Sequence, residues 1–481
     1  MDSRNKLSKE RLLQNRFTWS IAALLVVSLL VLSLSCQPAP TPTAVPLPTD
    51  TPIPKPTFTP TPIPDYLSLF VFPEDGSDVI LDALNAADES ITFVMYLVTH
   101  DDFIDALKAA EARGVEVRGM MEMNPYGGTS SNVDVFNELV EAGADMKWDH
   151  RGIKYLHEKM ILVDNELMFV MTCNMTTSAF TANREYGLID TNPTHIAEVV
   201  RVFEADWNRK DLALGDPLLV WSPFNAREAW LELIDSAQSS IDLEQNEMLD
   251  PQIEGHLIDA VGCGATVRYI SSPDWPIEKD VDEPARERMR QAGVLVRYLD
   301  DPFVHAKTFL VDGVRGFVGS ENVSTNSLDN NRELGVIFED EDSVERLTKQ
   351  FEADWAVASD EAFPTAGRAM PESGYIDHSD ARKFFYSEVT VELPVLYVYN
   401  SGQVAWLMPD DDVDSNFKVV IFPGDFSKWP ELPDVYYGGK TIRVMGLIEK
   451  YRGWPEIIVH NPEEIEIAGE TGQEPGRMPA D

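Results

Sequence analysis

The chain contains little cysteine: Cys36, Cys173 and Cys263 are the only three in 481 residues. An odd number of widely separated cysteines provides neither the framework of a disulfide-stabilised domain nor the close spacing of a zinc site. Folding must therefore depend on packed cores. A hydrophobic content of 44% over this length is enough for two or three of them.

Basic residues are also scarce. The 39 Lys and Arg stand against 81 Asp and Glu, which gives a formal net charge of -42. The mean field of such a protein repels polyanions and anionic membrane surfaces at low salt. A phosphate-bearing substrate would therefore have to bind in a locally basic site. High acidity also keeps proteins soluble, so net charge alone selects no function.

Charge is absent from residues 17–34, an apolar run that follows five basic residues within the first sixteen. With the small residues before Cys36, this order resembles a bacterial lipoprotein signal, in which the cysteine is lipidated after cleavage. An apolar run of about 18 residues is also long enough to remain as an uncleaved anchor. Both alternatives predict an exported protein held on the extracytoplasmic face of a bacterial membrane.

Residues 37–65 are dominated by Pro and Thr, which favour extended polyproline conformations and cannot form a core. We interpret them as a linker that holds the folded part away from the membrane. The predicted organisation is a signal or anchor over 1–36, a linker over 37–65, two related halves over 66–212 and 213–365, and a last domain over 380–470.

An internal repeat occupies residues 67–363. Helical spacing at 79–87 and 103–113 alternates with strand-like runs at 90–96 and 114–121, and the same order returns at 229–237, 240–243, 253–261 and 265–270. Helix, glycine and then apolar-polar alternation predicts crossover units on a largely parallel sheet. Each half is thus expected to be an α/β unit, with the two sheets facing one another.

Both halves lead to a strand that carries His, Lys and Asp at identical spacing. These residues are His157, Lys159 and Asp164 in the first half, and His305, Lys307 and Asp312 in the second. Within a strand, His and Lys two residues apart project from the same face. One histidine could attack phosphorus and the other protonate the leaving oxygen, while the lysines hold the developing charge. This set predicts phosphodiester cleavage without a metal or other cofactor.

The repeat continues after the two motifs, with polar residues at equal sequence separations in both halves. The second set of repeated polar residues is Thr172, Asn174 and Glu185 in the first half, and Ser320, Asn322 and Glu333 in the second. Two copies of HxKxxxxD, each followed by a GSxN-like motif, resemble the phospholipase D superfamily over residues 66–363. The resemblance implies two pseudo-symmetric α/β/α halves that face one active site and a covalent phosphohistidine intermediate.

Roles carry over from this resemblance by position. His157 and His305 would be nucleophile and acid, in an order that the sequence does not decide. The lysines and the asparagines Asn174 and Asn322 would contact phosphate oxygens, and Glu185 and Glu333 would orient the imidazoles. Asp164 and Asp312, which complete the two catalytic motifs, would have supporting structural roles.

One departure affects the first half, where Met171 and Thr172 stand in place of the Gly-Ser of the family motif. Thr172 keeps a hydroxyl group. The bulkier Met171 would either narrow the site on this side or mark a half-site that has weakened, whereas Gly319 and Ser320 keep the regular pattern.

Short alternating strands at 395–398, 404–407, 418–422, 441–444 and 456–459 predict a small all-β domain at the end of the chain. Residues 439–459 resemble the OB-fold modules attached to bacterial nucleases, which bind single strands through aromatic stacking and basic contacts. A barrel that only packs against the catalytic halves remains the alternative. The candidate strand-binding residues are Lys440, Arg443, Lys450, Tyr451, Arg452 and Trp454.

Three functions follow from these features. The leading one is a membrane-tethered extracytoplasmic nuclease, because the predicted OB-like barrel adds a surface for nucleic acid to the phosphodiesterase site. The second is a phospholipase D or phosphatidyltransferase of the cardiolipin synthase kind, which membrane tethering favours. The third is an inactive cell-surface binding protein, which would result from a dead first half-site.

Overall fold

The computed structural model describes residues 66–125, 131–149, 152–274, 277–363, 371–411, 417–451, 454–473 and 475–477. The predicted signal with Cys36 and the predicted linker over 37–65 lie outside the described residues. Among the helices that are described, none is both long and apolar enough to cross a membrane.

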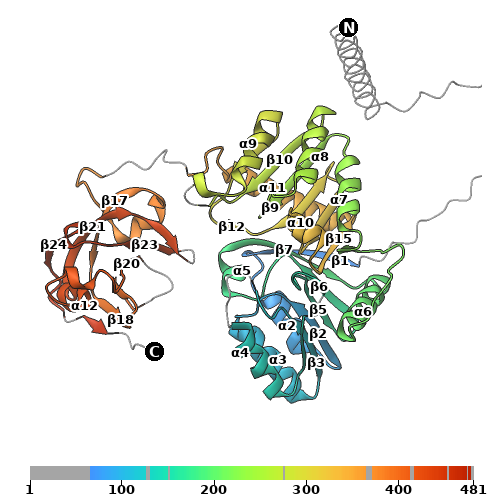
Figure 1. Cartoon of the computed structure of the whole chain (residues 1–481), viewed down its shortest axis with the longest axis horizontal. Coiled ribbons are helices and arrows are strands. Elements are labelled where there is room, and N and C mark those ends of the chain that lie inside the picture. Colours follow the sequence, from blue (N-terminus) through green and yellow to red (C-terminus); the bar gives the residue numbers. More distant parts are fainter. Residues whose placement is uncertain are drawn as a thin grey trace, which may run out of the picture. The chain divides into compact units, whose positions relative to one another are not determined.

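The first half forms one sheet flanked by helices (Figure 1). Its strand order is β1-β7-β6-β5-β2-β3-β4. Gly114, at φ 91°, ends α3 in the left-handed conformation that glycine adopts without strain. The elements are β1 (Leu67–Phe72), α2 (Asp78–Ala86), β2 (Ser90–Met95), α3 (Asp101–Arg113), β3 (Glu116–Met121), α4 (Ser131–Ala142), β4 (Asp145–Trp148), β5 (Lys159–Val163), β6 (Leu167–Met171), α5 (Thr177–Thr181), β7 (Asn183–Asp190) and α6 (Pro193–Trp207).

The second half repeats this arrangement, with the strand order β8-β15-β14-β13-β9-β10-β11. Its short β12 pairs instead with β7 of the first half. The elements are β8 (Val220–Ser222), α7 (Ala226–Asp235), β9 (Ser240–Gln245), α8 (Pro251–Gly262), β10 (Thr266–Ser271), α9 (Glu283–Ala292), β11 (Leu295–Tyr298), β12 (Phe303–Val304), β13 (Lys307–Val311), β14 (Arg315–Gly319), α10 (Thr325–Asp329), β15 (Glu333–Phe338) and α11 (Glu341–Val357).

The predicted α/β class and the pseudo-symmetric halves are confirmed, but the prediction of largely parallel sheets is wrong. The parallel pairs lie among β2, β3 and β4 in the first sheet and among β9, β10 and β11 in the second, and the short β12 also pairs in parallel with β7. The strands β5, β6, β7 and β1 are antiparallel neighbours, as are β13, β14, β15 and β8. Tight turns such as the one between β5 and β6 reverse the chain without a crossover helix, so the sheets are mixed.

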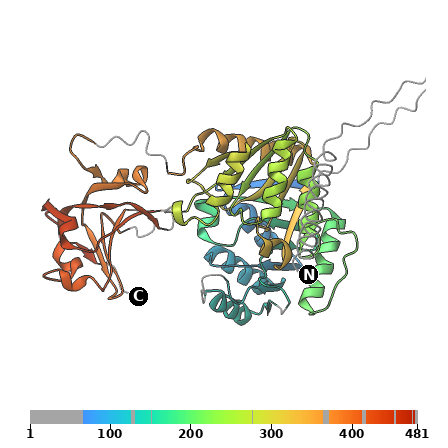
Figure 2. The same cartoon turned by 45° about the horizontal axis from the view of Figure 1, so that its top comes forward.

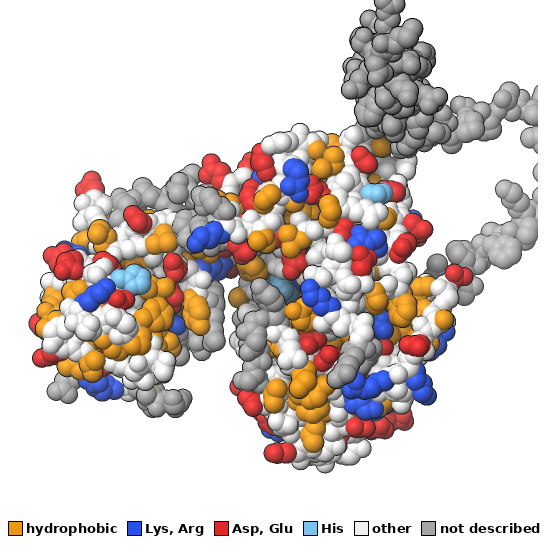
Figure 3. Space-filling view, in the orientation of Figure 1, with side chains coloured by type: hydrophobic (Ala, Val, Ile, Leu, Met, Phe, Trp, Pro, Cys, Tyr) orange, Lys and Arg blue, Asp and Glu red, His pale blue; other side chains and the backbone are white. Residues whose placement is uncertain are grey.

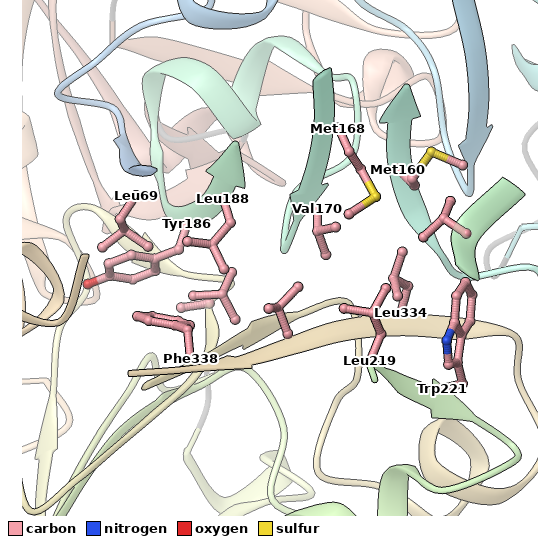
Figure 4. Close-up of a cluster of buried hydrophobic side chains, with 14 of the residues drawn as sticks. Leu69, Met160, Met168, Val170, Tyr186, Leu188, Leu219, Trp221, Leu334 and Phe338 are labelled. Carbon is pink, nitrogen blue, oxygen red and sulfur yellow. The ribbon is translucent and has the colours of Figure 1, made fainter. Parts of the chain in front are cut away.

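Each sheet is apolar on both faces. One face packs under α2, α3 and α4 in the first half and under α7, α8 and α9 in the second (Figures 1 and 2). The other faces share a single core to which both halves contribute, with Met160 and Val170 from the first half and Leu334 and Phe338 from the second (Figure 4). Because burial of this surface needs both halves, the hydrophobic effect fixes them against one another.

The C-terminal residues form two sheets around one core, which confirms the all-β character. Strands lie at all five predicted positions, as β18, β19, β20, β21 and β23, but β16, β17, β22, β24 and β25 were not predicted. The closer assignment to an OB-type barrel stays a prediction. The elements are β16 (Ile376–Asp377), β17 (Glu388–Pro394), β18 (Tyr397–Asn400), β19 (Ala405–Met408), β20 (Lys418–Ile421), α12 (Pro433–Tyr437), β21 (Lys440–Leu447), β22 (Glu449–Tyr451), β23 (Trp454–Ile458), β24 (Ile465–Glu470) and β25 (Gly476–Arg477).

Candidate active site

Each motif histidine lies just before a central strand, and its lysine is the first residue of that strand, β5 or β13. The chain that leads into each histidine pairs with the other half. The amide of His157 donates to the carbonyl of Arg332 at 2.9 Å, and the amide of His305 donates to the carbonyl of Arg184 at 3.2 Å. Backbone hydrogen bonds therefore bring the two motifs to one interface.

The same crossing forms two histidine-carboxylate pairs. Nδ1 of His157 lies 2.8 Å from Oε2 of Glu333, and Nδ1 of His305 lies 2.7 Å from Oε1 of Glu185. Each imidazole is thus oriented by a glutamate of the opposite half. Neither half contains a complete pair, so the active site exists only in the folded whole. We call these pairs the crossed dyads.

Further side chains hold the dyad carboxylates. Thr172 donates its hydroxyl to Glu185 at 2.6 Å. In the second half Ser327 donates the corresponding bond to Glu333 at 2.7 Å, while Ser320 accepts the amide of Leu334. Ser327 was not predicted, because its counterpart in the first repeat is Ala179, which carries no hydroxyl. The dyads are alike, but their supports differ.

Both motif lysines are fully buried and lie beside the histidines. Nζ of Lys159 donates to the carbonyl of His157 at 2.6 Å, and Lys307 donates to the carbonyl of His305. Asn174 and Asn322 each have an amide oxygen without a hydrogen-bond partner among the described residues. The two lysine amino groups can donate to phosphate oxygens, and the asparagines could do so only through their Nδ2 groups.

Asp164 and Asp312 bind backbone and do not contact the crossed dyads. The carboxylate of Asp164 accepts the amides of Asp88, Glu89 and Ser90 where β2 begins. Asp312 accepts the equivalent amides of residues 238–240 at the start of β9. These contacts fix the hairpin after the motif strand to the neighbouring parallel strand, which is a structural role.

The environment sets the charge of each group. Burial lowers the pKa of His157 to about 4 and that of Lys159 to about 7. It likewise lowers the pKa of His305 and Lys307. Burial acts to raise the pKa of Glu185 and Glu333, but their paired histidines outweigh it, so both pKa values are lowered. His157 is therefore a neutral imidazole at neutral pH, and both dyad carboxylates are ionised.

Met171 lies in the first-half core with Phe93 and Phe169, beneath the helices. The predicted narrowing of the site by this side chain is therefore not observed. In the second half the same space holds Glu321, because a Cβ at Gly319 would lie 2.3 Å from its Oε2. Buried Cys173, whose thiol pKa is raised by burial, replaces Glu321 in the first half. The two turns are alternative packings of one motif.

Sequence reasoning missed two further groups near the dyads. The ring of Tyr96 meets the imidazole of His157 edge-on, with centroids 4.6 Å apart. Glu158 is buried between the motif residues, and burial raises its pKa to about 8. Tyr96 carries no repeat signal, since Asn246 occupies the matching position after β9. In the described ranges, no group of three or more His, Cys, Asp or Glu side chains is arranged to hold a metal ion.

Four of the candidate strand-binding residues of the last domain contact other residues of the described chain. Arg443 pairs with Glu392 at 2.8 Å, Lys450 pairs with Asp300 at 3.0 Å, and Lys440 donates to the carbonyl of Tyr436. Trp454 faces the guanidinium of Arg382, Tyr451 is exposed, and Arg452 lies outside the described residues. These basic groups are thus engaged within the chain.

An aromatic pair on another part of the last domain was not predicted from the sequence. Tyr399 and Trp406 stack at 4.6 Å on adjacent strands, with Nζ of Lys418 5.0 Å from the Trp406 ring. On the face in Figure 3, Lys and Arg side chains are scattered among Asp and Glu. No continuous basic band crosses the described residues of this face.

Comparisons with known proteins agree with the repeat. A family model described as cardiolipin synthase, PLD-like domain, matches residues 80–207 and 230–355. A cardiolipin synthase of Staphylococcus aureus is 22% identical over 334 residues, which is 60% of this chain and 66% of that protein. A probable cardiolipin synthase of Bacillus subtilis is 33% identical over 135 residues, 27% of this chain and 26% of that protein. The chain thus spans just under two thirds of the first relative.

Solved structures include a phosphatidylserine synthase of Haemophilus influenzae, at 10% identity and a TM-score of 0.49, over 62% of this chain and 88% of that one. Nuc of Salmonella typhimurium, a phospholipase D family member, is 27% identical with a TM-score of 0.27, over 30% of this chain and 97% of that one.

Proposed function

The chain belongs to the phospholipase D superfamily, and from this premise we propose that it cleaves phosphodiester bonds through a covalent phosphohistidine. The observation that carries the proposal is the pair of crossed dyads, each beside a buried lysine. Both half-sites retain every charged member of the motif, which argues against an inactive binding protein. The Met171 substitution leaves both dyads in place.

In the first step, Nε2 of His157 attacks phosphorus while its Nδ1–H remains hydrogen-bonded to Glu333. The bond from phosphorus to the leaving alcohol oxygen breaks, and that oxygen takes a proton from Nε2 of His305. Lys159, Lys307 and the two asparagines stabilise the negative charge on the phosphoryl oxygens. Glu185 stabilises the imidazolium form of His305 that the step requires.

In the second step, water or an acceptor alcohol attacks the phosphohistidine. Neutral His305 removes its proton, the bond from phosphorus to nitrogen breaks, and both histidines return to their starting states. Hydrolysis and transfer thus differ only in the attacking hydroxyl. We assign the nucleophile to His157 and the acid to His305, but burial lowers the pKa of both imidazoles, so the covalent trapping described below decides the order.

We propose a phospholipid as the substrate, in a phospholipase D or phosphatidyltransferase reaction. The family model that spans both halves carries the description of cardiolipin synthase. The net charge of -42 opposes both nucleic acid and an anionic lipid surface, so it does not separate these two substrates. The engaged state of Arg443 and Lys450 weakens the expectation of a nuclease.

Nucleic acid remains the second candidate because of one observation. The stacked Tyr399 and Trp406 are an aromatic pair of the kind on which the bases of single strands stack.

The test uses the full chain in EDTA with vesicles of phosphatidylglycerol, and labelled single- and double-stranded DNA in parallel. Headgroup release or cardiolipin formation is expected, and His157→Ala and His305→Ala should each reduce it by at least about 10³-fold. A phosphatidyl-enzyme stable to alkali and labile to acid should form in His305→Ala and be absent in His157→Ala.

Four other outcomes would contradict parts of the proposed function. Cleavage of DNA without any reaction of the lipid would show that the protein is a nuclease and not a phospholipid-cleaving enzyme. A strict requirement for divalent metal would contradict the two-histidine mechanism. If the phosphatidyl-enzyme formed in His157→Ala and not in His305→Ala, His305 would be the nucleophile and His157 the acid. Silence on both substrates, with both histidines intact, would favour the binding protein.

A further inference from the structure

A buried arginine directly precedes each dyad glutamate. Arg332 binds Asp206 with two hydrogen bonds, from Nε at 2.7 Å and from Nη2 at 3.0 Å. Arg184 pairs with Asp354 through one hydrogen bond, from Nη2 to Oδ1 at 2.9 Å, and its Nε lies 2.7 Å from Oδ2 as an ion-pair contact. Both arginines and both aspartates are buried. In each pair the two residues come from opposite halves, so the pairs cross the interface as the dyads do.

The aspartates occupy equivalent places near the ends of α6 and α11. Both lie in a Phe-Glu-Ala-Asp-Trp sequence, at 203–207 and at 351–355, with the same separation as the two motif histidines. The flanking residues pack alike, since Arg118 lies over Trp207 and pairs with Glu204, and Arg268 lies over Trp355 and pairs with Glu352. This duplicated segment was not used in predicting the site.

The arginine backbones hold the histidine segments. The Arg332 carbonyl accepts the amide of His157, and the Arg332 amide donates to the carbonyl of Tyr155, both at 2.9 Å. On the other side Arg184 accepts the amide of His305 and is in register with Val304. Each arginine therefore contacts the histidine segment with its backbone and a helix of the histidine's own half with its side chain.

We propose that Arg332–Asp206 and Arg184–Asp354 are positioning pairs, each of which fixes the geometry of one crossed dyad by tying the glutamate strand to the half that carries the histidine. The inference rests on the proposed phosphohistidine chemistry. Neither pair touches the reacting atoms. Arg332–Asp206 acts through Glu333 on His157, and Arg184–Asp354 acts through Glu185 on His305.

Stability alone is a weak reason for such pairs. Removing two charges from water costs several kcal/mol per ion, and buried ion pairs are often no more stabilising than apolar residues of similar volume. Their geometric demand is strict, however, because bidentate bonds between guanidinium and carboxylate fix distance and orientation. A site built from two halves needs that constraint, since small displacements can cost a large part of the rate.

The test compares Asp206→Asn with Asp242→Asn in the full chain. Asp242 makes the same bidentate bond with Arg268, at 2.6 and 2.8 Å, and is similarly buried, but both partners lie in the second half. On bis(p-nitrophenyl) phosphate in EDTA, Asp206→Asn should lower kcat about 10- to 100-fold with KM nearly unchanged. Asp242→Asn should stay within about twofold of the parent.

A double-mutant cycle identifies the dyad involved. Asp206→Asn should add less than about threefold to the loss in Glu333→Gln, because both act on His157, but should multiply the loss in Glu185→Gln. Equal kcat losses in Asp206→Asn and Asp242→Asn, in proportion to lowered thermal stability, would overturn the proposal. Multiplicative losses in both backgrounds would also overturn it.

A spectroscopic readout separates this inference from the proposed function. In the chain labelled with ¹⁵N-histidine and assigned through the two histidine variants, Asp206→Asn should shift the His157 resonances and spare those of His305. Asp354→Asn should do the reverse, which keeps the test valid if one variant fails to fold. Resonances unmoved in both variants would refute positioning, whether or not any substrate is turned over.

Discussion

At the scale of single residues, similar carboxyl groups carry different charges around the active site. Glu185 and Glu333 have lowered pKa values because each faces a histidine. Glu158 has no such partner, so burial raises its pKa to about 8. Burial also raises the pKa of Glu321, whose two oxygens have no hydrogen-bond partner among the described residues. Location and not residue type therefore decides which carboxyls are ionised.

Glu158 should make stability depend on pH. The folded chain keeps its proton up to about pH 8, whereas the reference value for the free side chain is 4.5. The stability contributed by the protonated form is therefore complete below pH 4.5 and is lost as the pH rises through about 8. Glu158→Gln cannot ionise, so its free energy of unfolding relative to the parent should rise over this range by up to about 1.4 kcal/mol per pH unit.

Urea unfolding of the parent and of Glu158→Gln at several pH values from 4.5 to 8 measures this difference. Glu141→Gln on the exposed surface of α4 serves as the control and should follow the parent at every pH. Parallel curves for the parent and Glu158→Gln would show that Glu158 is not held protonated in the folded chain.

At the scale of elements, the two halves fill the equivalent space beside β6 and β14 with different side chains. The turn after β6 fills the space under the sheet with Met171 and Cys173, and the turn after β14 fills it with Glu321 beside Gly319. In both copies the chain continues to an asparagine and a helix N-cap, Thr176 or Ser324. The departure from the family motif therefore preserves the backbone path that the site needs.

Gly319→Ala should destabilise the protein by about 1–3 kcal/mol, because its Cβ would lie 2.3 Å from Glu321 and 2.6 Å from the Cα of Gly335. Gly255→Ala is the matched control. Gly255 lies inside α8 with nothing within 4 Å of the added Cβ, so alanine should stabilise the helix by about 0.5–1 kcal/mol. Thermal unfolding of both variants measures the contrast, and a neutral Gly319→Ala would show that the second turn can relax.

At the scale of the whole molecule, the residues of the proposed catalysis and those of the expected membrane attachment lie in separate parts of the sequence. The two halves share one core and one active site, while the expected export signal and linker precede them in the sequence. A phospholipid substrate would be consistent with membrane attachment, because tethering raises the local concentration of enzyme at the lipid surface. The lipidated form of the expected attachment depends on Cys36, which lies outside the described residues.

Expression in a bacterium supplied with labelled palmitate tests this attachment. The parent chain should incorporate the label and fractionate with membranes, and Cys36→Ser should do neither if the signal is cleaved before the cysteine. Membrane association of an unlabelled Cys36→Ser chain would support the uncleaved anchor. Soluble, unlabelled parent protein would contradict both forms of attachment.

The sequence alone predicted which residues would carry the proposed chemistry. His157, Lys159 and their counterparts stand out because a spacing duplicated along the chain survives divergence, and strand periodicity places His and Lys together. The sheets were harder to predict, since apolar runs of this length do not show whether neighbouring strands are parallel or antiparallel. The side chains of the last domain were harder still, because Arg443 and Lys450 appear free until their acidic partners are seen.

Only the tertiary structure decided how the repeated parts combine. The sequence offers each histidine two equivalent glutamates, and its equal spacings favour neither. His157 pairs with Glu333 and His305 with Glu185 because the shared apolar core brings the two sheets together and the chain before each histidine hydrogen-bonds to the opposite half. Motif spacing is a local property of the chain, whereas the crossed pairing results from burying the surface that joins the halves.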